Sequence, residues 1–202
     1  MKTIKPLIIL VLLTLFSCNQ EAVKSNNQTN LELTNPFTTK FLTESLRKDL
    51  PRLVLNDEID QILRNKLKTD AVVKNIYQAI KLNADEVMQM PFLERIQIGK
   101  RLLSVSREML RRINMLGMVY HVEKDPKILE RIDGEVKAVC AFSDWNPSHY
   151  LDVGEMSMAV AFALDWTAGN LPNSTLELAL DALIEKGIKP SYDTSKKSNI
   201  GW

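Results

Sequence analysis

The sequence predicts an all-α protein made of antiparallel helical hairpins. From about residue 56 onward, stretch after stretch carries apolar residues with a period near 3.6, and most stretches begin with a residue able to cap a helix. No stretch alternates between apolar and polar residues well enough to predict a strand. Short connections favour antiparallel neighbours, which leaves a toroid, a solenoid or an irregular bundle open. The lack of a clean repeat of fixed length weakens the regular solenoids.

The N-terminal residues read as a targeting segment ahead of one helical domain. Lys2 and Lys5 precede an apolar run at 6–16, the layout of a secretory signal and too short for a permanent membrane span. The run ends in Leu-Phe-Ser-Cys, which resembles the bacterial lipobox and predicts lipidation of Cys18. An ordinary cleaved signal is the alternative.

These signals divide the chain into a lipoprotein signal peptide at 1–18, a polar tether at 19–34 and a helical domain at 35–202. The expected location is the cell envelope, in the periplasm or on the outer membrane, with the membrane as a partner through the lipid anchor.

Composition and charge fit one globular domain and argue against a nucleic-acid binder. With 202 residues, of which 45% are hydrophobic and 25% charged, the chain suits one globular domain. Removing the signal takes away two lysines and no acid, so the formal net charge changes from +1 to −1, and we expect no nucleic-acid partner. With Cys18 lipidated, Cys140 has no partner for an intramolecular disulfide, and we expect it in the core.

Two helices open the domain. Asn56 can cap a first helix, whose apolar residues are Ile59, Ile62, Leu63 and Leu67. Asp70 can cap a second helix. The apolar face of the second helix consists of Val73, Ile76, Tyr77, Ile80, Ala84 and Val87.

A long third helix is expected from about Ile96 to Val122, after Pro91. Its buried seam should consist of Leu102, Met109, Ile113, Leu116 and Tyr120. Its arginines read mostly as a solvated face, with a row that binds polyanions as the alternative. They are Arg101, Arg107, Arg111 and Arg112.

Three more helices follow. Asp125 and Pro126 begin a fourth, which carries Ile128, Ile132, Val136 and Val139 and ends at Phe142. The fifth starts near His149, and its stretch 156–164 is apolar on all sides except at Ser157, which predicts a helix surrounded by protein. In the sixth, Ser174 and Glu177 have capping-box spacing and Gly187 supplies the stop. Its apolar stripe is Leu176, Leu180, Leu183 and Ile184.

The connection CAFSDWNPSHYLDVGEM, residues 140–156, carries more aromatic and titratable groups than a turn needs. Part of it has a purely structural explanation: Asn146 before Pro147 favours an extended or turn conformation, and Ser148 can cap the next helix. Asp152 and Glu155 suit the positive end of that helix. His149 is the residue that this explanation accounts for least, although a lone histidine is often structural.

Three segments resemble the N-terminal part of heparinase II/III-like polysaccharide lyases: DLPRLVLNDEIDQI at 49–62, IGKRLLSVSREMLRRI at 98–113 and, most specifically, CAFSDWNPSHYLDVGEMSMAVAFALDW at 140–166. The resemblance covers roughly residues 51–190. It implies an incomplete α/α toroid of helical hairpins, followed in full-length members by antiparallel β-domains, and cleavage of polysaccharides that contain uronic acid by β-elimination.

That reaction requires a neutralised uronate carboxylate, a base and an acid. The resemblance implies that Asn146 and His149 contact sugar hydroxyls or carboxylate, while Trp145 or Tyr150 stacks on a pyranose ring. The family's NNW-like segment and its later histidines and tyrosines have no match here, so the catalytic residues stay unassigned. The resemblance therefore predicts an N-terminal fragment that is inactive alone. Its expected partner is an acidic polysaccharide or oligosaccharide.

The alternative is a non-catalytic helical lipoprotein that binds glycan or has a structural role. No cofactor and no metal site are expected, since the two histidines and Cys140 lack ligand spacing. Gly-rich phosphate loops and a Gly-x-Ser-x-Gly elbow are absent from the sequence. His121 reads as structural.

Overall fold

The structure, a computed structural model, describes residues 38–192. Cys18, the signal peptide and the tether lie outside the described residues. The chain divides into two compact units, residues 1–46 and 47–202. In the first, α1 (Thr39–Ser45) is capped by Thr38 and buries none of its residues.

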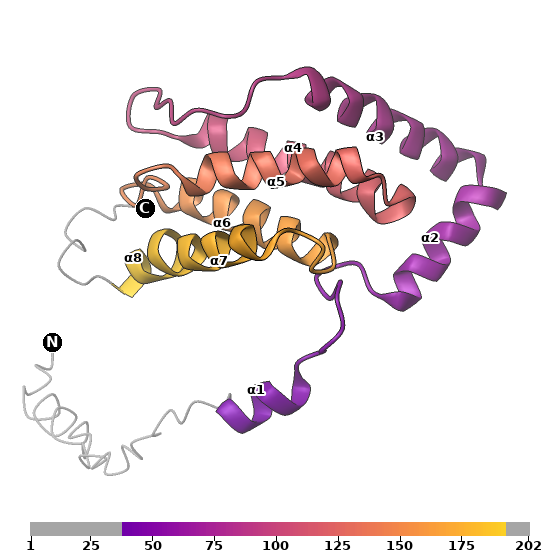
Figure 1. The fold of residues 1–202 in the computed structure, drawn as a ribbon, viewed down its shortest axis with the longest axis horizontal. Helices are drawn as coiled ribbons and strands as arrows, with labels where there is room; N and C mark the ends of the chain where they lie inside the picture. Colours follow the sequence, from indigo (N-terminus) through magenta and orange to yellow (C-terminus); the bar gives the residue numbers. More distant parts are fainter. Residues whose placement is uncertain (1–37, 193–202) are drawn as a thin grey trace, which may run out of the picture. The chain divides into compact units, whose positions relative to one another are not determined.

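The described part of the second unit is all-helical, as expected, and contains no strand beyond one isolated pairing of Ile98 with Arg101 (Figure 1). Its elements are α2 (Asp57–Thr69), α3 (Ala71–Gln89), α4 (Leu103–Glu123), α5 (Pro126–Cys140), α6 (Tyr150–Trp166), α7 (Asn173–Ala182), the π-helical turn η1 (Leu183–Ile188) and α8 (Lys189–Tyr192). Among the described residues, no helix is both long enough and apolar enough to cross a membrane.

Three of the expected helix starts are confirmed by their cap hydrogen bonds. The Asn56 side chain accepts from the backbone N–H of Ile59, and Asp125 accepts from that of Lys127 ahead of α5. Asp70 ends α2 and caps α3, where its side chain accepts from two backbone N–H groups. Each cap supplies an acceptor to backbone donors that have no partner within the helix.

The expected start of the third helix at Ile96 is wrong, because α4 begins at Leu103. Residues 98–101 form a tight turn in which Ile98 and Arg101 exchange backbone hydrogen bonds of 2.9 and 3.1 Å. Gly99 has φ +62°, a conformation that glycine adopts without a Cβ penalty. The apolar period continues through this turn, so periodicity alone extends the helix too far.

Two pairs of alternate helices, α4 with α6 and α5 with α7–η1, run parallel. Near their starts, Ser106 of α4 donates a hydrogen bond to Glu155 of α6 (2.9 Å), and near their ends Gly117 packs on the Trp166 ring. The pair α5 and α7–η1 follows the same rule: Thr175 donates to Asp133 (2.6 Å), and Lys186 donates to the Cys140 carbonyl (2.5 Å). In these two pairs, helices that are two apart in the chain therefore lie side by side.

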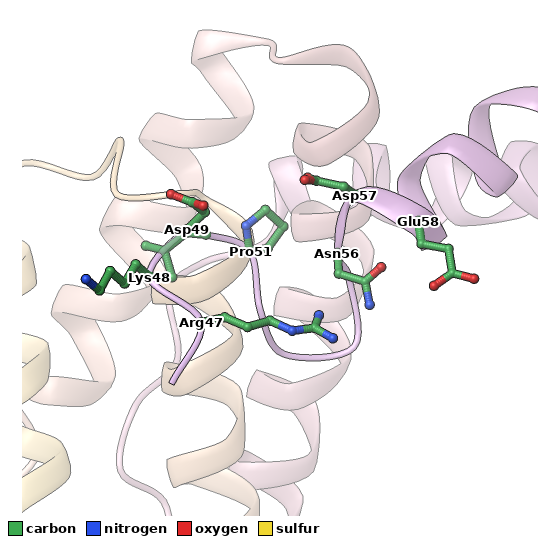
Figure 2. Close-up of a pocket in the computed structure, with 8 residues that line it drawn as sticks. Arg47, Lys48, Asp49, Pro51, Asn56, Asp57 and Glu58 are labelled. Atoms are coloured by element: carbon green, nitrogen blue, oxygen red, sulfur yellow. The ribbon is translucent and has the colours of Figure 1, made fainter. Parts of the chain in front are cut away.

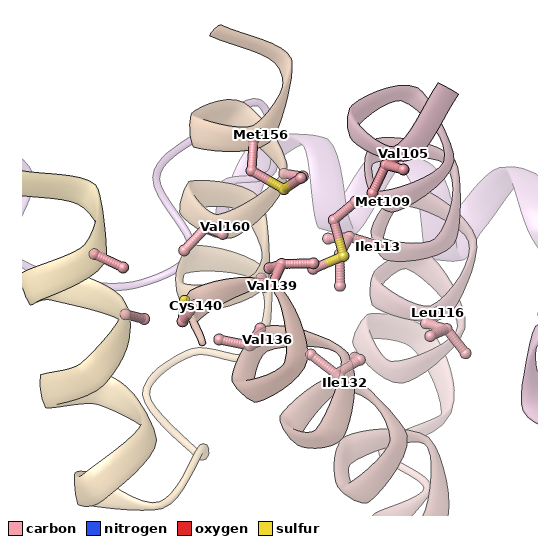
Figure 3. Close-up of a cluster of buried hydrophobic side chains, with 14 of the residues drawn as sticks. Val105, Met109, Ile113, Leu116, Ile132, Val136, Val139, Cys140, Met156 and Val160 are labelled. Atoms are coloured by element: carbon pink, nitrogen blue, oxygen red, sulfur yellow. The ribbon is translucent and has the colours of Figure 1, made fainter. Parts of the chain in front are cut away.

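The core lies among α4, α5 and α6, as Figure 3 shows. Every expected seam residue of the third and fourth helices is buried. Those residues are Leu102, Met109, Ile113, Leu116, Tyr120, Ile128, Ile132, Val136 and Val139. The expectation that protein surrounds the fifth helix is met in part: Met156, Ala159, Val160 and Ala163 are buried, whereas Met158 is 48% exposed and the other residues of 156–164 are half-buried.

The sixth helix differs from expectation in three ways. The capping box does not form, since α7 begins at Asn173 without a side-chain cap. Its buried face consists of the small residues Thr175, Ala179 and Ala182, which allow close packing, while the expected stripe is half-buried or exposed. Gly187 does not stop the helix; it lies within η1, where a Cβ would come 2.7 Å from the Ser157 hydroxyl.

The reading of the α4 arginines as a solvated face is wrong for Arg112, which is 4% exposed. Its guanidinium donates to Glu108, to the Pro91 carbonyl and to the fully buried Glu135. Arg131 donates to the same Glu135 oxygen from one turn away on α5. These contacts join the α3–α4 connection to the α4–α5 hairpin.

Candidate functional site

The connection between α5 and α6, residues 141–149, turns at Asn146, which has φ +62°. Asparagine tolerates this left-handed conformation better than most residues. The Asn146 backbone N–H donates to Asp144 (2.7 Å), and the Asn146 carbonyl accepts from the backbone of His149 (2.9 Å). Of the two conformations that the Asn-Pro pair allows, extended or turn, the structure has the turn, stabilised by local hydrogen bonds.

The Asn146 side chain is used within the protein. Its Nδ2 donates to the Lys100 carbonyl (2.8 Å) and to Asp152 Oδ2 (2.7 Å), and its Oδ1 accepts from the Ser148 hydroxyl (2.7 Å). Only 3% of the residue is exposed. Ser148 is thereby engaged with Asn146 and does not cap α6, whose N-cap position is His149. In this conformation Asn146 fixes the loop and offers no group to a sugar.

Trp145 is fully buried in the core, and its indole N–H donates to the Val139 carbonyl (3.0 Å). A stacking platform must expose one ring face, so in this conformation Trp145 cannot stack on a pyranose ring. Tyr150 is half-buried against the core, and its hydroxyl is buried without a hydrogen-bond partner. Of the four residues that the resemblance assigns to sugar contact, Trp145 and Asn146 are buried, whereas His149 and Tyr150 are partly exposed.

Asp152 is the residue on which the contacts converge. Its side chain is fully buried in the first turn of α6, and Oδ2 accepts from the Leu102 backbone (2.7 Å) as well as from Asn146. The sequence placed Asp152 only at the positive end of a helix. The structure adds that it joins α6 to the start of α4, a contact between residues 50 apart that no local pattern reveals.

Two basic side chains flank the other oxygen of Asp152. Arg101 Nε lies 3.5 Å from Oδ1 and His149 Nδ1 lies 3.4 Å from it. The side chain of Arg101 is 37% exposed and that of His149 is 27% exposed. The buried carboxylate therefore holds a guanidinium and an imidazole near each other at the surface, an arrangement suited to binding a carboxylate.

One turn further along α6, Glu155 accepts from Ser106 (2.9 Å) and from Arg107 (3.1 Å). The side chain of Arg107 is 60% exposed. This second acid–arginine contact is separate from Asp152, which Arg107 does not touch.

The other two residues considered from the sequence are buried. Burial raises the pKa of the Cys140 thiol to about 11, so it is protonated near neutral pH and is a poor nucleophile. His121 is 4% exposed, and its Nε2 lies 2.7 Å from Asp60 Oδ1. Within residues 38–192 no group of three or more His, Cys, Asp or Glu side chains is placed to hold a metal ion.

A separate pocket of about 350 Å³ lies ahead of and at the start of α2, and Figure 2 shows its lining. The lining residues are Arg47, Lys48, Asp49, Leu50, Pro51, Asn56, Asp57 and Glu58. Next to the lining residue Pro51, the backbone N–H groups of Arg52 and Leu53 donate to Asp165 of α6. The lining mixes exposed charges of both signs with no buried polar group, so it indicates no particular ligand chemistry.

Comparison with known proteins adds no assignment: no protein-family model matches the chain, and no curated protein matches it.

Proposed function

We propose that this chain is the helical, sugar-binding part of a cell-envelope polysaccharide lyase, and that acidic sugars bind at the edge formed by Arg101 and His149. The observation that carries the proposal is the placement of both side chains against one oxygen of the buried Asp152. A guanidinium pairs with a carboxylate through two parallel hydrogen bonds, and an imidazole can add a third donor. A uronate carboxylate has the charge and the shape for this edge.

The packing of the helices supports the finer fold that the resemblance implies. In an incomplete α/α toroid, successive hairpins place alternate helices side by side in an inner and an outer layer. The parallel pairs α4–α6 and α5–α7 have this relation. We propose that these hairpins form part of such a toroid.

Binding without cleavage is expected of this chain alone. Beta-elimination needs a positioned base and acid beside the neutralised carboxylate. The Tyr150 hydroxyl is buried, and Arg101 and His149 are assigned to the carboxylate. Losing members of a cooperating catalytic set removes nearly all of the rate.

The test is calorimetric titration of the chain with oligosaccharides rich in uronic acid, from alginate and from glycosaminoglycans, and with neutral oligosaccharides. Arg101→Ala and His149→Ala should each weaken binding of the acidic sugars by about tenfold, or about 1.4 kcal/mol. Arg107→Ala is the matched control, since this arginine pairs with Glu155 and not with Asp152, and it should change affinity little. Absorbance of the unsaturated uronide product should not rise.

Equal affinity for neutral sugars, or variants that bind acidic sugars as wild type does, would refute the assignment of Arg101 and His149 as the binding edge. Sustained turnover would instead contradict the prediction that this chain does not cleave the sugar. It would not contradict binding by Arg101 and His149.

A non-catalytic structural helical lipoprotein is the second candidate. The observation that favours it is that Trp145 and Asn146, which carry much of the resemblance, are fully used in core and loop contacts. Failure of all acidic sugars to bind, in a chain that is cooperatively folded, is the result that this candidate predicts.

A further inference from the structure

The helix α2 is attached to the rest of its unit by few apolar contacts. None of its residues is buried, and Ile59 and Ile62 on its apolar face are 40% and 46% exposed. A segment with so little buried apolar surface opens at a lower free energy than the core around it. Its polar contacts with α4 therefore contribute a large share of its attachment.

Those polar contacts converge on His121 near the end of α4. Asp60 Oδ1 lies 2.7 Å from His121 Nε2, and Asp60 Oδ2 accepts from Arg64 Nε at 2.7 Å. Arg64 also donates to the His121 carbonyl (3.3 Å). Asp60 and Arg64 lie one turn apart on α2. They thus bind both the side chain and the backbone of His121.

The second nitrogen of the His121 ring has no such partner. Nδ1 is buried and makes no hydrogen bond. With Nε2–H donating to the Asp60 carboxylate, Nδ1 carries the lone pair, and protonating it would create a buried N–H with no acceptor. A buried donor without an acceptor is costly, so the docked geometry favours the neutral ring.

We propose that Asp60, Arg64 and His121 form a latch that holds α2 on α4 at neutral pH and that acid releases. When α2 lifts, the His121 ring returns to water, where a proton on Nδ1 is solvated. Acid therefore favours the lifted state.

The neighbouring charges agree with this direction. Burial lowers the pKa of His121 and outweighs the opposite effect of Asp60, while Lys124 and Arg64 lower the pKa further. For Asp60, burial would raise the pKa, but hydrogen bonds from Arg64 and His121 outweigh it and lower the pKa. On α3, Tyr77 and Lys81 are both paired with Glu123.

Since both pKa values are lowered when α2 is docked, the lifted state binds protons more readily. The latch contributes its full stability above the ordinary histidine pKa of about 6.5 and loses it as the pH falls through the lower pKa of the docked state.

Hydrogen exchange of the full chain tests the latch. The measured quantity is the protection of α2 amides divided by that of α4 amides, each corrected for intrinsic exchange, at about pH 5 and about pH 8. In wild type the ratio should fall several-fold at the lower pH. His121→Gln can still donate to Asp60 but cannot take up a proton, so its ratio should not change with pH. His149→Gln, the matched control, should respond as wild type does.

A wild-type ratio that is the same at both pH values, or the same fall in His121→Gln, would overturn the proposal. A second measurement does not depend on His121→Gln folding: NMR titration of His121 in His149→Gln and in His149→Gln with Asp60→Asn. If α2 lifts, the pKa of His121 rises in the second variant. If α2 stays docked, loss of the carboxylate lowers the pKa, and the latch is refuted.

Discussion

Arg112 shows how much one side chain can contribute to this fold. It is buried on α4 and shares Glu135 with Arg131, so removing it leaves a buried carboxylate short of a charged partner. Breaking one side of a buried ion pair costs about 3–5 kcal/mol. Arg112→Met should therefore lower the free energy of unfolding by about that amount, measured by urea denaturation.

The neighbouring Arg111 provides the control. It also binds Glu108, but its side chain is 32% exposed, and exposed ion pairs contribute at most about 1 kcal/mol. Arg111→Met should stay within that limit. If the two substitutions lower the free energy of unfolding equally, the buried Arg112–Glu135 pair does not contribute the stability assigned to it.

At the scale of the helix, the parallel contact of α4 with α6 depends on Gly117. A Cβ at this position would lie 2.9 Å from the Trp166 ring, which is 6% exposed and so has little room to move. Forcing extra atoms into a packed contact costs about 1–3 kcal/mol, and this outweighs the helix preference of alanine over glycine, about 1 kcal/mol. Gly117→Ala should lower the melting temperature.

Gly154 in α6 is the matched position, since a Cβ there meets nothing within 4 Å. Gly154→Ala should raise the melting temperature, because only the helix preference acts. A Gly117→Ala protein as stable as Gly154→Ala would mean that α4 and α6 are not held this close in solution.

At the scale of the whole molecule, we propose that Cys18 carries the lipid that places the chain in the cell envelope. Cys18→Ala should move the protein from the membrane to the soluble fraction, because each buried methylene of a lipid contributes about 0.8 kcal/mol to membrane binding. Cys140→Ala should remain membrane-bound, since that thiol is 3% exposed in the core. Unmodified wild-type Cys18, found by mass spectrometry, together with a membrane-bound Cys18→Ala protein, would refute the anchor.

Sequence by itself determined the local features: the all-α class, the caps Asn56, Asp70 and Asp125, and the buried seams of α4 and α5. These features depend on residues a few positions apart, which periodicity and cap chemistry record directly. The turn at Asn146 belongs to the same group.

Tertiary structure decided what depends on residues far apart in the chain. Burial of Arg112, the small-residue face of α7 and the tight turn at residues 98–101 follow from packing between elements, which a helical period does not encode. The candidate site follows the same division. The sequence singled out His149 as a candidate. Its neighbour Arg101 lies in the α3–α4 connection, and only the shared contact with the buried Asp152 brings the two together. The burial of Trp145 and Asn146 likewise depends on neighbours that only the fold brings together.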